Sequence, residues 1–522
     1  MEVQKIVRQG ANDRWLISDV AFDYIPKFDF DPVITEPTGT LTPSATDGVI
    51  TLTASTGTPF STASINQYLQ GSGGRARIIK YTSVRVVTAV TEIPFYTTTA
   101  IATGEWEYLT GFEDVWSSTR GFPKTVSFHE GRLYFGGSRD RPQTIWGSKV
   151  SLFFDFDLGS LFDDEAIDAT LNTSQINEIV NVKSSNGNLL IFTTGSEFSV
   201  TGTITPQGFS PVPVSQYGSE KPFDIGVIDN NNIFIQRGGK SIYRFAYDTI
   251  QQFSDSENIS LLSSHLLDTP LDFAVRRSTS TEESNLALYI NSSNQLIMGT
   301  ILFLQEVIGF SKRETVNSTA GKFLNVGVDQ AEIYCVVERT VNSSTQKYLE
   351  RMRDSLNLDS SVSYSSFPTN TFAGLDHLEG ETVKVIADGS VLSDEIVSGG
   401  SVTIDREATT SCEIGLNMTP VVKTLPLEVI GQGTKIGLKK RISDTTLRVQ
   451  DTGDFTLNGY EVSFRTFGEA GDGSPLDTAP PTFTGDKKVK GILGWAERKQ
   501  LTISQTEPTD LKVLSITMNV NL

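Results

Sequence analysis

The residue types that most often carry catalysis are scarce in this chain of 522 residues. It has three histidines, His129, His265 and His377, and none of them has the spacing of a zinc ligand relative to another histidine or to a cysteine. His377 has Asp376 and Glu379 nearby, which would suit an acid–base group, but a turn histidine that hydrogen-bonds its own loop is the favoured interpretation. We expect His129, which shortly precedes a turn glycine, to pack at the edge of a sheet. These patterns predict no catalytic residue, no metal site and no cofactor site.

Acidic residues gather in one short stretch that could bind a hard cation or form a charged wall. Its members are Asp155, Asp157, Asp163, Asp164, Glu165 and Asp168. Oxygen-rich loops bind Ca²⁺, but the EF-hand spacing and its central glycine are absent. The favoured interpretation is structural: Asp163 and Asp164 cap a turn, and the other acids face solvent or a channel. Asp163, Asp164, Glu165 and Asp168 are therefore candidate channel-lining or interface residues.

Arg139 and Arg141, on either side of Asp140, form a local basic patch with aromatic residues nearby. Arginine stacks on bases and pairs with phosphate, so a nucleic-acid contact is one interpretation. A salt bridge between molecules or between neighbouring sheets is favoured, because the segment that follows is acidic. Arg139 and Arg141 join the candidate channel or interface residues.

The overall charge limits the classes of partner. With 62 acidic and 43 basic residues the chain has a formal charge of −19, which disfavours tight binding to nucleic acid. An acidic wall repels phosphate, so the same charge suits plain solubility and a conduit through which DNA slides. Cys335 and Cys412 lie in separate apolar runs and are expected to be buried free thiols of a protein assembled in a reducing cytoplasm. We expect neither a signal peptide nor a membrane span, because Ile301–Leu304 is the longest strongly apolar stretch.

The elements that must position these residues are strands, and the fold class is expected to be all-β. A hairpin-like pattern recurs at intervals of 44 to 55 residues, at 131–137, 186–194, 230–237, 285–290 and 331–337. A period of roughly 40 to 50 residues with about four strands is typical of a β-propeller blade. We expect about six blades, the sixth combining Phe112–Phe128 with residues near 350–367. An irregular string of hairpins in two sandwiches is the alternative.

Composition and turn signals divide the chain into four parts. Residues 1–36 and 104–120 are expected to lead into the core, 37–103 to form a small inserted β-barrel or sandwich, 121–367 the propeller-like domain, and 368–522 a β-rich C-terminal platform. Asp388-Gly389 is a hairpin signal within the last part. Two short helices are expected, one over 259–267 capped by Ser260 and one over Lys347–Asp354.

Many ordered segments of this chain are similar to those of the tail nozzle proteins of short-tailed, podovirus-type phages, also called the tail tubular protein B family. They run over about 310 residues: Trp116 with GFP at 121–123, FHEGRLYFGGS at 128–138, RPQTIWGS at 141–148, FDDEAID at 162–168, LLIFTTGSEFSV at 189–200, QYGSEKP at 216–222, IQRGGKSIYRFAYD at 235–248, SHLL at 264–267, LERM at 349–352, GLDHLEGETVKVIADGS at 374–390, and IGL with KTLPLE within 414–428. Each segment alone is a packing or turn motif.

The resemblance implies a non-enzymatic virion protein: a subunit of a hexameric ring at the distal end of the tail, with a β-propeller in each subunit and a central channel for genome ejection. Six copies of a −19 chain would carry about −114, which suits a repulsive channel wall. The implied partners are further copies of the chain, the tail adaptor ring, tail fibre or tip proteins, and DNA that passes without tight binding. Family members carry a substantial segment before the part that matches Trp15–Val20, whereas this chain begins close to it.

Two other functions stay open at this point. One is a tail-borne glycan depolymerase or peptidoglycan hydrolase, which would need two carboxylates about 5 to 9 Å apart across a groove. The other is a receptor-binding tail protein, in which the Thr/Ser-rich insert at 37–103 would hold the recognition surface.

Overall fold

The computed structural model describes residues 2–10, 13–159, 161–173, 177–248, 253–280, 283–316, 321–365, 368–428, 437–464, 479–490 and 494–521. The all-β expectation is confirmed, since strands dominate and the helical segments found in these ranges are short 3-10 turns. The chain forms two compact units, Met1–Ala287 with Gly299–Phe310, and Leu288–Met298 with Ser311–Leu522.

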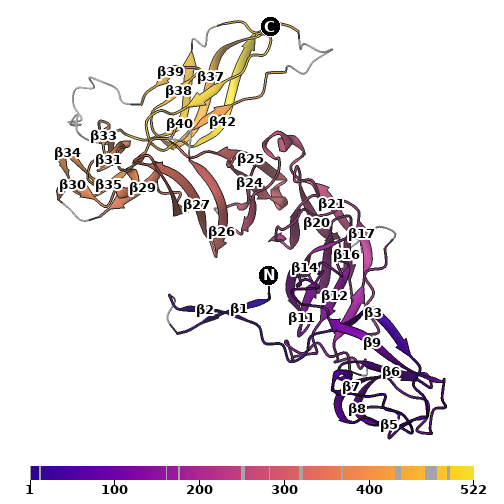
Figure 1. The fold of residues 1–522 in the computed structure, drawn as a ribbon. Helices are drawn as coiled ribbons and strands as arrows, with labels where there is room; N and C mark the ends of the chain where they lie inside the picture. The colour runs from indigo at the N-terminus through magenta and orange to yellow at the C-terminus, as the bar shows by residue number, and fades with distance from the viewer. Residues whose placement is uncertain are drawn as a thin grey trace. The chain divides into compact units, whose positions relative to one another are not determined.

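Successive strands of the central part pair in chain order as antiparallel meanders (Figure 1). The first contains β10 (Thr125–His129), β11 (Arg132–Gly136), β12 (Thr144–Gly147) and β13 (Ile167–Thr170). The second contains β14 (Ile179–Ser185), β15 (Asn188–Thr193), β16 (Glu197–Val200) and β17 (Val212–Ser215). The third contains β18 (Gly226–Ile228), β19 (Asn231–Ile235), β20 (Ile242–Asp248) and β21 (Phe253–Asn258). A fourth contains β22 (Asp272–Arg276), β23 (Asn285–Ile290), β24 (Leu296–Leu302) and β25 (Val307–Arg313).

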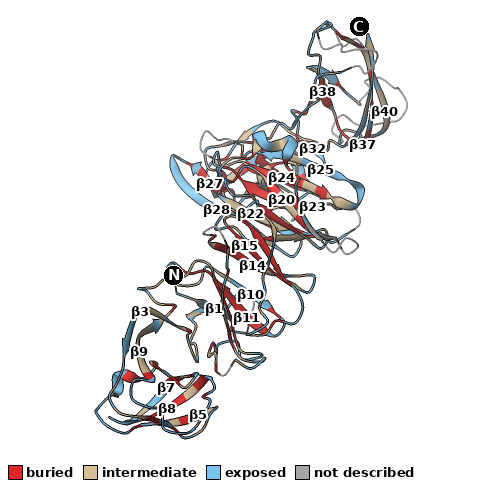
Figure 2. Ribbon diagram, turned by 90° about the vertical axis from the view of Figure 1, so that its right-hand side faces the viewer, coloured by how far each residue is buried: buried red, intermediate tan, exposed pale blue. Residues whose placement is uncertain are grey.

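The recurring sequence pattern marks the second strand of each meander. Its five instances coincide with β11, β15, β19, β23 and, in a three-stranded sheet, β27 (Glu332–Val341). β11 and β23 are buried along their whole length, and β15 and β19 at every residue but the first, as the red strands of Figure 2 show for β11 and β15. A strand covered on both faces keeps apolar residues at successive positions, which explains why this strand stands out in the sequence.

The described residues do not form the expected sixth set of strands. Phe112 belongs to β9 (Trp106–Asp114) of a different sheet, Phe128 lies in β10 of the first meander, and β29 (Asp359–Tyr364) pairs with β35 (Cys412–Leu416). The error arose because apolar alternation identifies a strand but carries no information about its partner.

Polar side chains join consecutive meanders of the first unit where their early strands approach. The Thr125 hydroxyl accepts a hydrogen bond from the Val182 amide at 3.1 Å, and His129 Nδ1 lies 2.8 Å from the Ser184 hydroxyl. Asn232 Nδ2 donates to the Ser185 hydroxyl at 3.1 Å. Beneath these contacts, apolar residues of the first and second meanders form one buried cluster that includes Tyr134, Ile145, Ile191 and Phe198. The first three meanders are therefore held together by apolar clusters with polar contacts at their edge.

The inserted part is a seven-stranded sheet with its own core. Its order is β3-β9-β6-β7-β8-β5-β4, with β3 (Lys27–Thr35), β4 (Leu41–Pro43), β5 (Val49–Ala54), β6 (Tyr68–Gly71), β7 (Gly74–Ser83) and β8 (Val86–Ile93), and the turn η1 (Thr62–Ser64). The sheet extends past the expected limits of 37–103, because β9 pairs with β6 of the insert and β3 pairs with β9. Before it, β1 (Gln4–Arg8) and β2 (Trp15–Asp19) form a two-stranded hairpin.

In its described residues the second unit contains five further sheets. β27 pairs with β26 (Lys322–Asp329) and β28 (Ser344–Met352). A second sheet has the order β29-β35-β31-β32, with β31 (Thr382–Ala387), β32 (Ser390–Val391) and β33 (Glu395–Ile396) on β31, and it shares a core with the pair β30 (Thr369–Ala373) and β34 (Ser401–Ala408). The last two sheets are β36-β41-β38-β39 and β40-β37-β42, formed by β36 (Val421–Lys423), β37 (Arg441–Thr452), β38 (Phe455–Leu457), β39 (Tyr460–Val462), β40 (Phe483–Lys490), β41 (Thr502–Ser504) and β42 (Val513–Asn521).

Of the two expected helices, the one at Lys347–Asp354 is wrong, and the one at 259–267 is formed only as a short 3-10 helix. Lys347–Asp354 falls mostly in strand β28, which pairs with β27 over its whole length. The segment at 259–267 is a 3-10 turn, η2 (Leu261–Leu266), because the Ser260 hydroxyl donates to Asn258 and accepts the Ile242 amide instead of capping a helix. The other short turns are η3 (Phe303–Gln305) and η4 (Asp376–Leu378).

Candidate interface on the first four-stranded sheet

A buried arginine holds the acidic turn. Arg132 begins β11, is 2% exposed, and its guanidinium donates to the backbone carbonyls of Ser148, at 2.7 Å, and of Asp163 and Glu165. Burial lowers the pKa of Arg132 from its ordinary value, and the three carbonyls replace the water it has lost. The guanidinium thus fixes the turn by binding its backbone carbonyls, and it forms no hydrogen bond with the side chains of Asp163 or Glu165.

The candidate acids of this turn divide by environment. Asp163 and Asp164 are exposed, whereas Glu165 is half-buried and accepts the Phe162 amide at 3.0 Å. The Val150 amide donates to the Asp164 carbonyl at 2.9 Å, which joins the turn to the loop after β12. The carboxylates of Asp163 and Asp164 are therefore exposed on a turn whose backbone is hydrogen-bonded to the rest of the sheet. Their assignment to a channel wall or an interface stays a prediction.

Asp168 and Arg141 form a shielded pair within the same sheet. Asp168, on β13, accepts from Arg141 Nη1 and from Trp146 Nε1, both at 3.0 Å. Both charged side chains are 13% exposed, and the Arg141 guanidinium stacks on the Phe28 ring at 3.9 Å. Burial raises the pKa of Asp168, and the two donors oppose that effect. The salt bridge predicted for Arg141 thus lies inside one sheet instead of between sheets.

Arg139 is the exposed member of the basic patch. Its guanidinium donates to the carboxylate of Asp140 at 2.9 Å. Asp140 also forms a salt bridge with Arg120, and Arg120 forms a second one with Glu113 of β9. These two arginines lower the pKa of Asp140. The patch is therefore a chain of alternating charges that runs from the inserted sheet to the loop before β12.

A second buried network, which sequence reasoning missed, connects the inserted sheet to the loop after β12. Arg77 of β7 is 3% exposed, donates to Asp157 at 2.6 Å and stacks over Tyr24 at 4.2 Å. Nearby, Arg75 pairs with the buried Glu92 at 2.9 Å. Burial raises the pKa of both Tyr24 and Glu92. The sequence predicts that Asp157 faces solvent or a channel, whereas its distant partner on β7 shows that it joins the loop after β12 to the inserted sheet.

The histidines take structural positions. His129 is 5% exposed and bonded to Ser184, and burial lowers its pKa. His377 Nε2 donates to the carbonyl of Ser360 on β29 at 2.9 Å, so the expected bond to its own loop is not the one formed. Glu379 instead accepts the amides of Gly399 and Gly400. Cys335 and Cys412 are buried free thiols, as expected, and burial raises the pKa of Cys412 to about 12.

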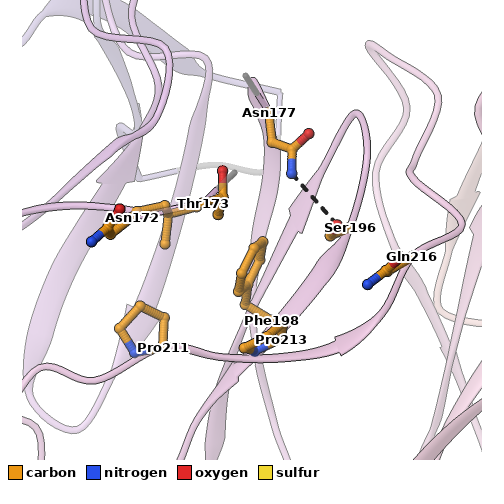
Figure 3. A pocket seen from close by; sticks show the side chains of 9 residues that line it. Asn172, Thr173, Asn177, Ser196, Phe198, Pro211, Pro213 and Gln216 are labelled. Carbon is orange, nitrogen blue, oxygen red and sulfur yellow. Dashed lines mark hydrogen bonds between the residues drawn. The ribbon is translucent and has the colours of Figure 1, made fainter. Parts of the chain in front are cut away.

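A small polar pocket lies at the second meander (Figure 3). Its volume is about 240 Å³, and Asn177 donates to the Ser196 hydroxyl at 3.5 Å beside the Phe198 ring. The lining residues of this pocket are Leu171, Asn172, Thr173, Asn177, Ser196, Phe198, Pro211, Pro213 and Gln216. They offer amides and hydroxyls but no carboxylate, so this pocket does not supply the acid pair of a glycosidase.

Two further properties concern the described residues only. No three histidine, cysteine, aspartate or glutamate side chains among them lie close enough together to hold a metal ion. The helical segments in these ranges are too short to cross a membrane.

Comparison with known proteins identifies no family. No family model and no curated protein sequence matches the chain. Among solved structures, similar ones include a protein from Lactobacillus plantarum (12% identity, 66% of this chain and 96% of that chain, TM-score 0.29) and the N-terminal domain of Nup159 (10%, 73% and 88%, TM-score 0.27). Another is an exo-β-1,3-galactanase from Phanerochaete chrysosporium (9%, 77% and 98%, TM-score 0.27).

Proposed function

We propose that this chain is a structural subunit of a short phage tail: a nozzle protein that assembles as a hexameric ring and surrounds the path of the ejected genome. Its place would be the virion tail, next to an adaptor ring and tail fibre or tip proteins, and it would be assembled in the host cytoplasm. In this proposal it is not an enzyme. The four meanders and the sheet β26-β27-β28 would be successive blades of a propeller-like domain.

The observation that carries the proposal is the ordered series of nozzle-like segments between Trp116 and Glu428. Several of them fall at positions that build and join successive sheets: FHEGRLYFGGS spans the turn from β10 to β11, and LLIFTTGSEFSV spans β15 and β16. Segments with structural duties of this kind, kept in the same order, favour a shared architecture over a chance match.

The exposed acids fit a conduit for DNA. Asp163 and Asp164 are exposed on a turn whose backbone Arg132 binds, and the whole chain carries −19. Repulsion between such a surface and phosphate would let DNA pass without being retained.

Native mass spectrometry of the purified chain, with and without the adaptor protein, tests the proposal. A nozzle subunit forms a hexamer of about 343 kDa from the 57.1 kDa chain, or binds as six copies to the adaptor ring. A stable trimer, or a chain that stays monomeric on the adaptor, would contradict the proposal. A trimer would favour the receptor-binding alternative, in which deletion of the insert at 37–103 abolishes adsorption to the host.

A further inference from the structure

A groove in the second unit is lined chiefly by two segments of the chain, with Phe323 of β26 and Cys335 of β27 also in its wall. It has a volume of about 690 Å³, and its lining includes every residue from Tyr348 to Asp354 and every residue from Leu358 to Ser363. Successive side chains of a strand point to opposite faces. A groove lined by consecutive residues is therefore bordered by the edge of the strand, where backbone N–H and C=O groups are available.

The sheet pairing agrees with this. β28 is the last strand of the sheet β26-β27-β28, and β29 is the first strand of the sheet β29-β35-β31-β32. In the described part of the chain, β28 pairs only with β27, and it is exposed or half-buried at every position, as its pale blue ribbon in Figure 2 shows. An open edge of nine residues is a template for a further strand.

The two borders of the groove are joined by side chains instead of by backbone pairing, and the Ser360 hydroxyl of β29 donates to Glu350 of β28 at 3.4 Å. Arg339 of β27 donates to Glu350 of β28 at 2.7 and 2.8 Å, and to Asp359 of β29 at 3.0 and 3.2 Å. These two carboxylates raise the pKa of Arg339 further above its ordinary value, although burial acts the other way. The Glu350 and Asp359 carboxylates are thereby paired with Arg339, and the backbone edge of β28 takes no part in joining the two borders.

β28 is the better template of the two edges. β29 is interrupted by a bulge between Asp359 and Val362, and its Ser360 carbonyl already accepts a hydrogen bond from His377. On β28, the exposed side chains include Lys347 and Leu349, followed on the same face by Arg351, which pairs with Glu332 at 3.5 Å. Arg353 continues this alternation just after the strand, with the exposed acid Asp354 next to it.

We propose that the β28 edge binds an extended segment of a partner protein by strand addition. In the described residues neither Lys347 nor Arg353 has an ion pair, and six residues of strand place them about 20 Å apart with Leu349 between them. The matching ligand is a segment of about seven residues with a carboxylate at each end and apolar side chains in the middle, facing Leu349. Hydrogen bonds of the ligand's main chain to the β28 edge would supply the affinity, and its side chains would fix which residues of the two strands lie opposite each other.

The test is binding of a fluorescein-labelled peptide, Glu-Thr-Val-Thr-Val-Thr-Glu, to the full chain, followed by fluorescence anisotropy. The double variant Lys347→Glu with Arg353→Glu should bind at least tenfold more weakly. The control Lys5→Glu with Lys80→Glu makes the same charge change at exposed positions elsewhere and should bind as the unmodified chain does. Peptide binding should also slow amide hydrogen exchange at 344–352.

Backbone methylation separates strand addition from simple charge attraction. Alternate amides of an extended peptide point to the same side, so N-methylation of the odd residues blocks one edge and N-methylation of the even residues blocks the other. One of these two peptides should lose binding and the other should keep it. Equal binding by both, or no binding of the unmethylated peptide at millimolar concentration, would overturn the proposal. Displacement of a self-associated form of the chain by the peptide would assign the groove to a second copy instead of a partner.

Discussion

Three shielded guanidinium groups of the described residues are satisfied in three different ways. Arg132 is surrounded by carbonyls, Arg141 pairs with one carboxylate and an aromatic ring, and Arg339 pairs with two carboxylates. Each solution compensates desolvation, and each joins segments that are distant in sequence. Arg132 thereby fixes the backbone of the acidic turn, and Arg339 joins β27 to β28 and β29.

Asp388 gives a prediction at the residue scale. Asp388 and Gly389 form the expected hairpin turn, with φ of 49° and 74°, and the Asp388 carboxylate accepts the amides of Thr409, Thr410 and Ser411. These hydrogen bonds hold the pKa of Asp388 well below its ordinary value of 3.8. Asp388→Asn should therefore destabilise the second unit by about 1 kcal/mol at pH 7, a modest loss because the group is close to solvent.

The sign of the pH effect follows from the lowered pKa. Above pH 3.8 the carboxylate is ionised in the folded and unfolded states and contributes fully, and below it the unfolded state takes up the proton first, so the contribution is lost. The difference between Asp388→Asn and the unmodified chain, measured by urea unfolding, should shrink as the pH falls below about 4. Asp405→Asn, at an exposed position on β34, should show no such difference. A difference in unfolding free energy between Asp388→Asn and the unmodified chain that does not change with pH would contradict the role given to Asp388.

At the scale of elements, the close approach of the first two meanders depends on a glycine of the nozzle-like segment LYFGGS. A Cβ on Gly136 of β11 would lie 2.8 Å from Ile179 Cγ2 and 2.9 Å from Val182 Cγ2, both on β14. No backbone strain is involved, because Gly136 does not have a positive φ. The absence of a side chain at this position is what lets the two sheets pack.

Gly136→Val should separate the first and second meanders. Overpacking of this kind costs about 2 kcal/mol, and more if β14 cannot shift. The matched control is Gly309→Val on β25, where a Cβ meets no atom within 4 Å. Thermal unfolding with hydrogen exchange at β11 and β14 would measure both variants. Equal stability of the two would show that the meanders tolerate a larger spacing.

At the scale of the whole molecule, the proposed conduit depends on charge presented toward DNA. Asp163→Asn with Asp164→Asn should leave folding unchanged, because Arg132 binds the backbone carbonyls of the turn and not these side chains. If the two acids line the channel, the assembled ring should retain double-stranded DNA more strongly in a gel-shift experiment at low salt. If they lie in a subunit interface, the mass of the assembly should change instead. A variant that alters neither would remove Asp163 and Asp164 from both roles.

The sequence by itself determined the all-β class, the period of the strong strands, the Asp388-Gly389 turn and the burial of both cysteines. These features depend on local alternation, turn chemistry and apolar runs, which are readable along one chain. The tertiary structure alone decided that Arg132 holds the acidic turn, that Arg77 meets Asp157, and that β28 and β29 end their sheets. Arg132 lies 31 residues from Asp163 and Arg77 lies 80 residues from Asp157, and a strand pattern does not specify what pairs with its edge.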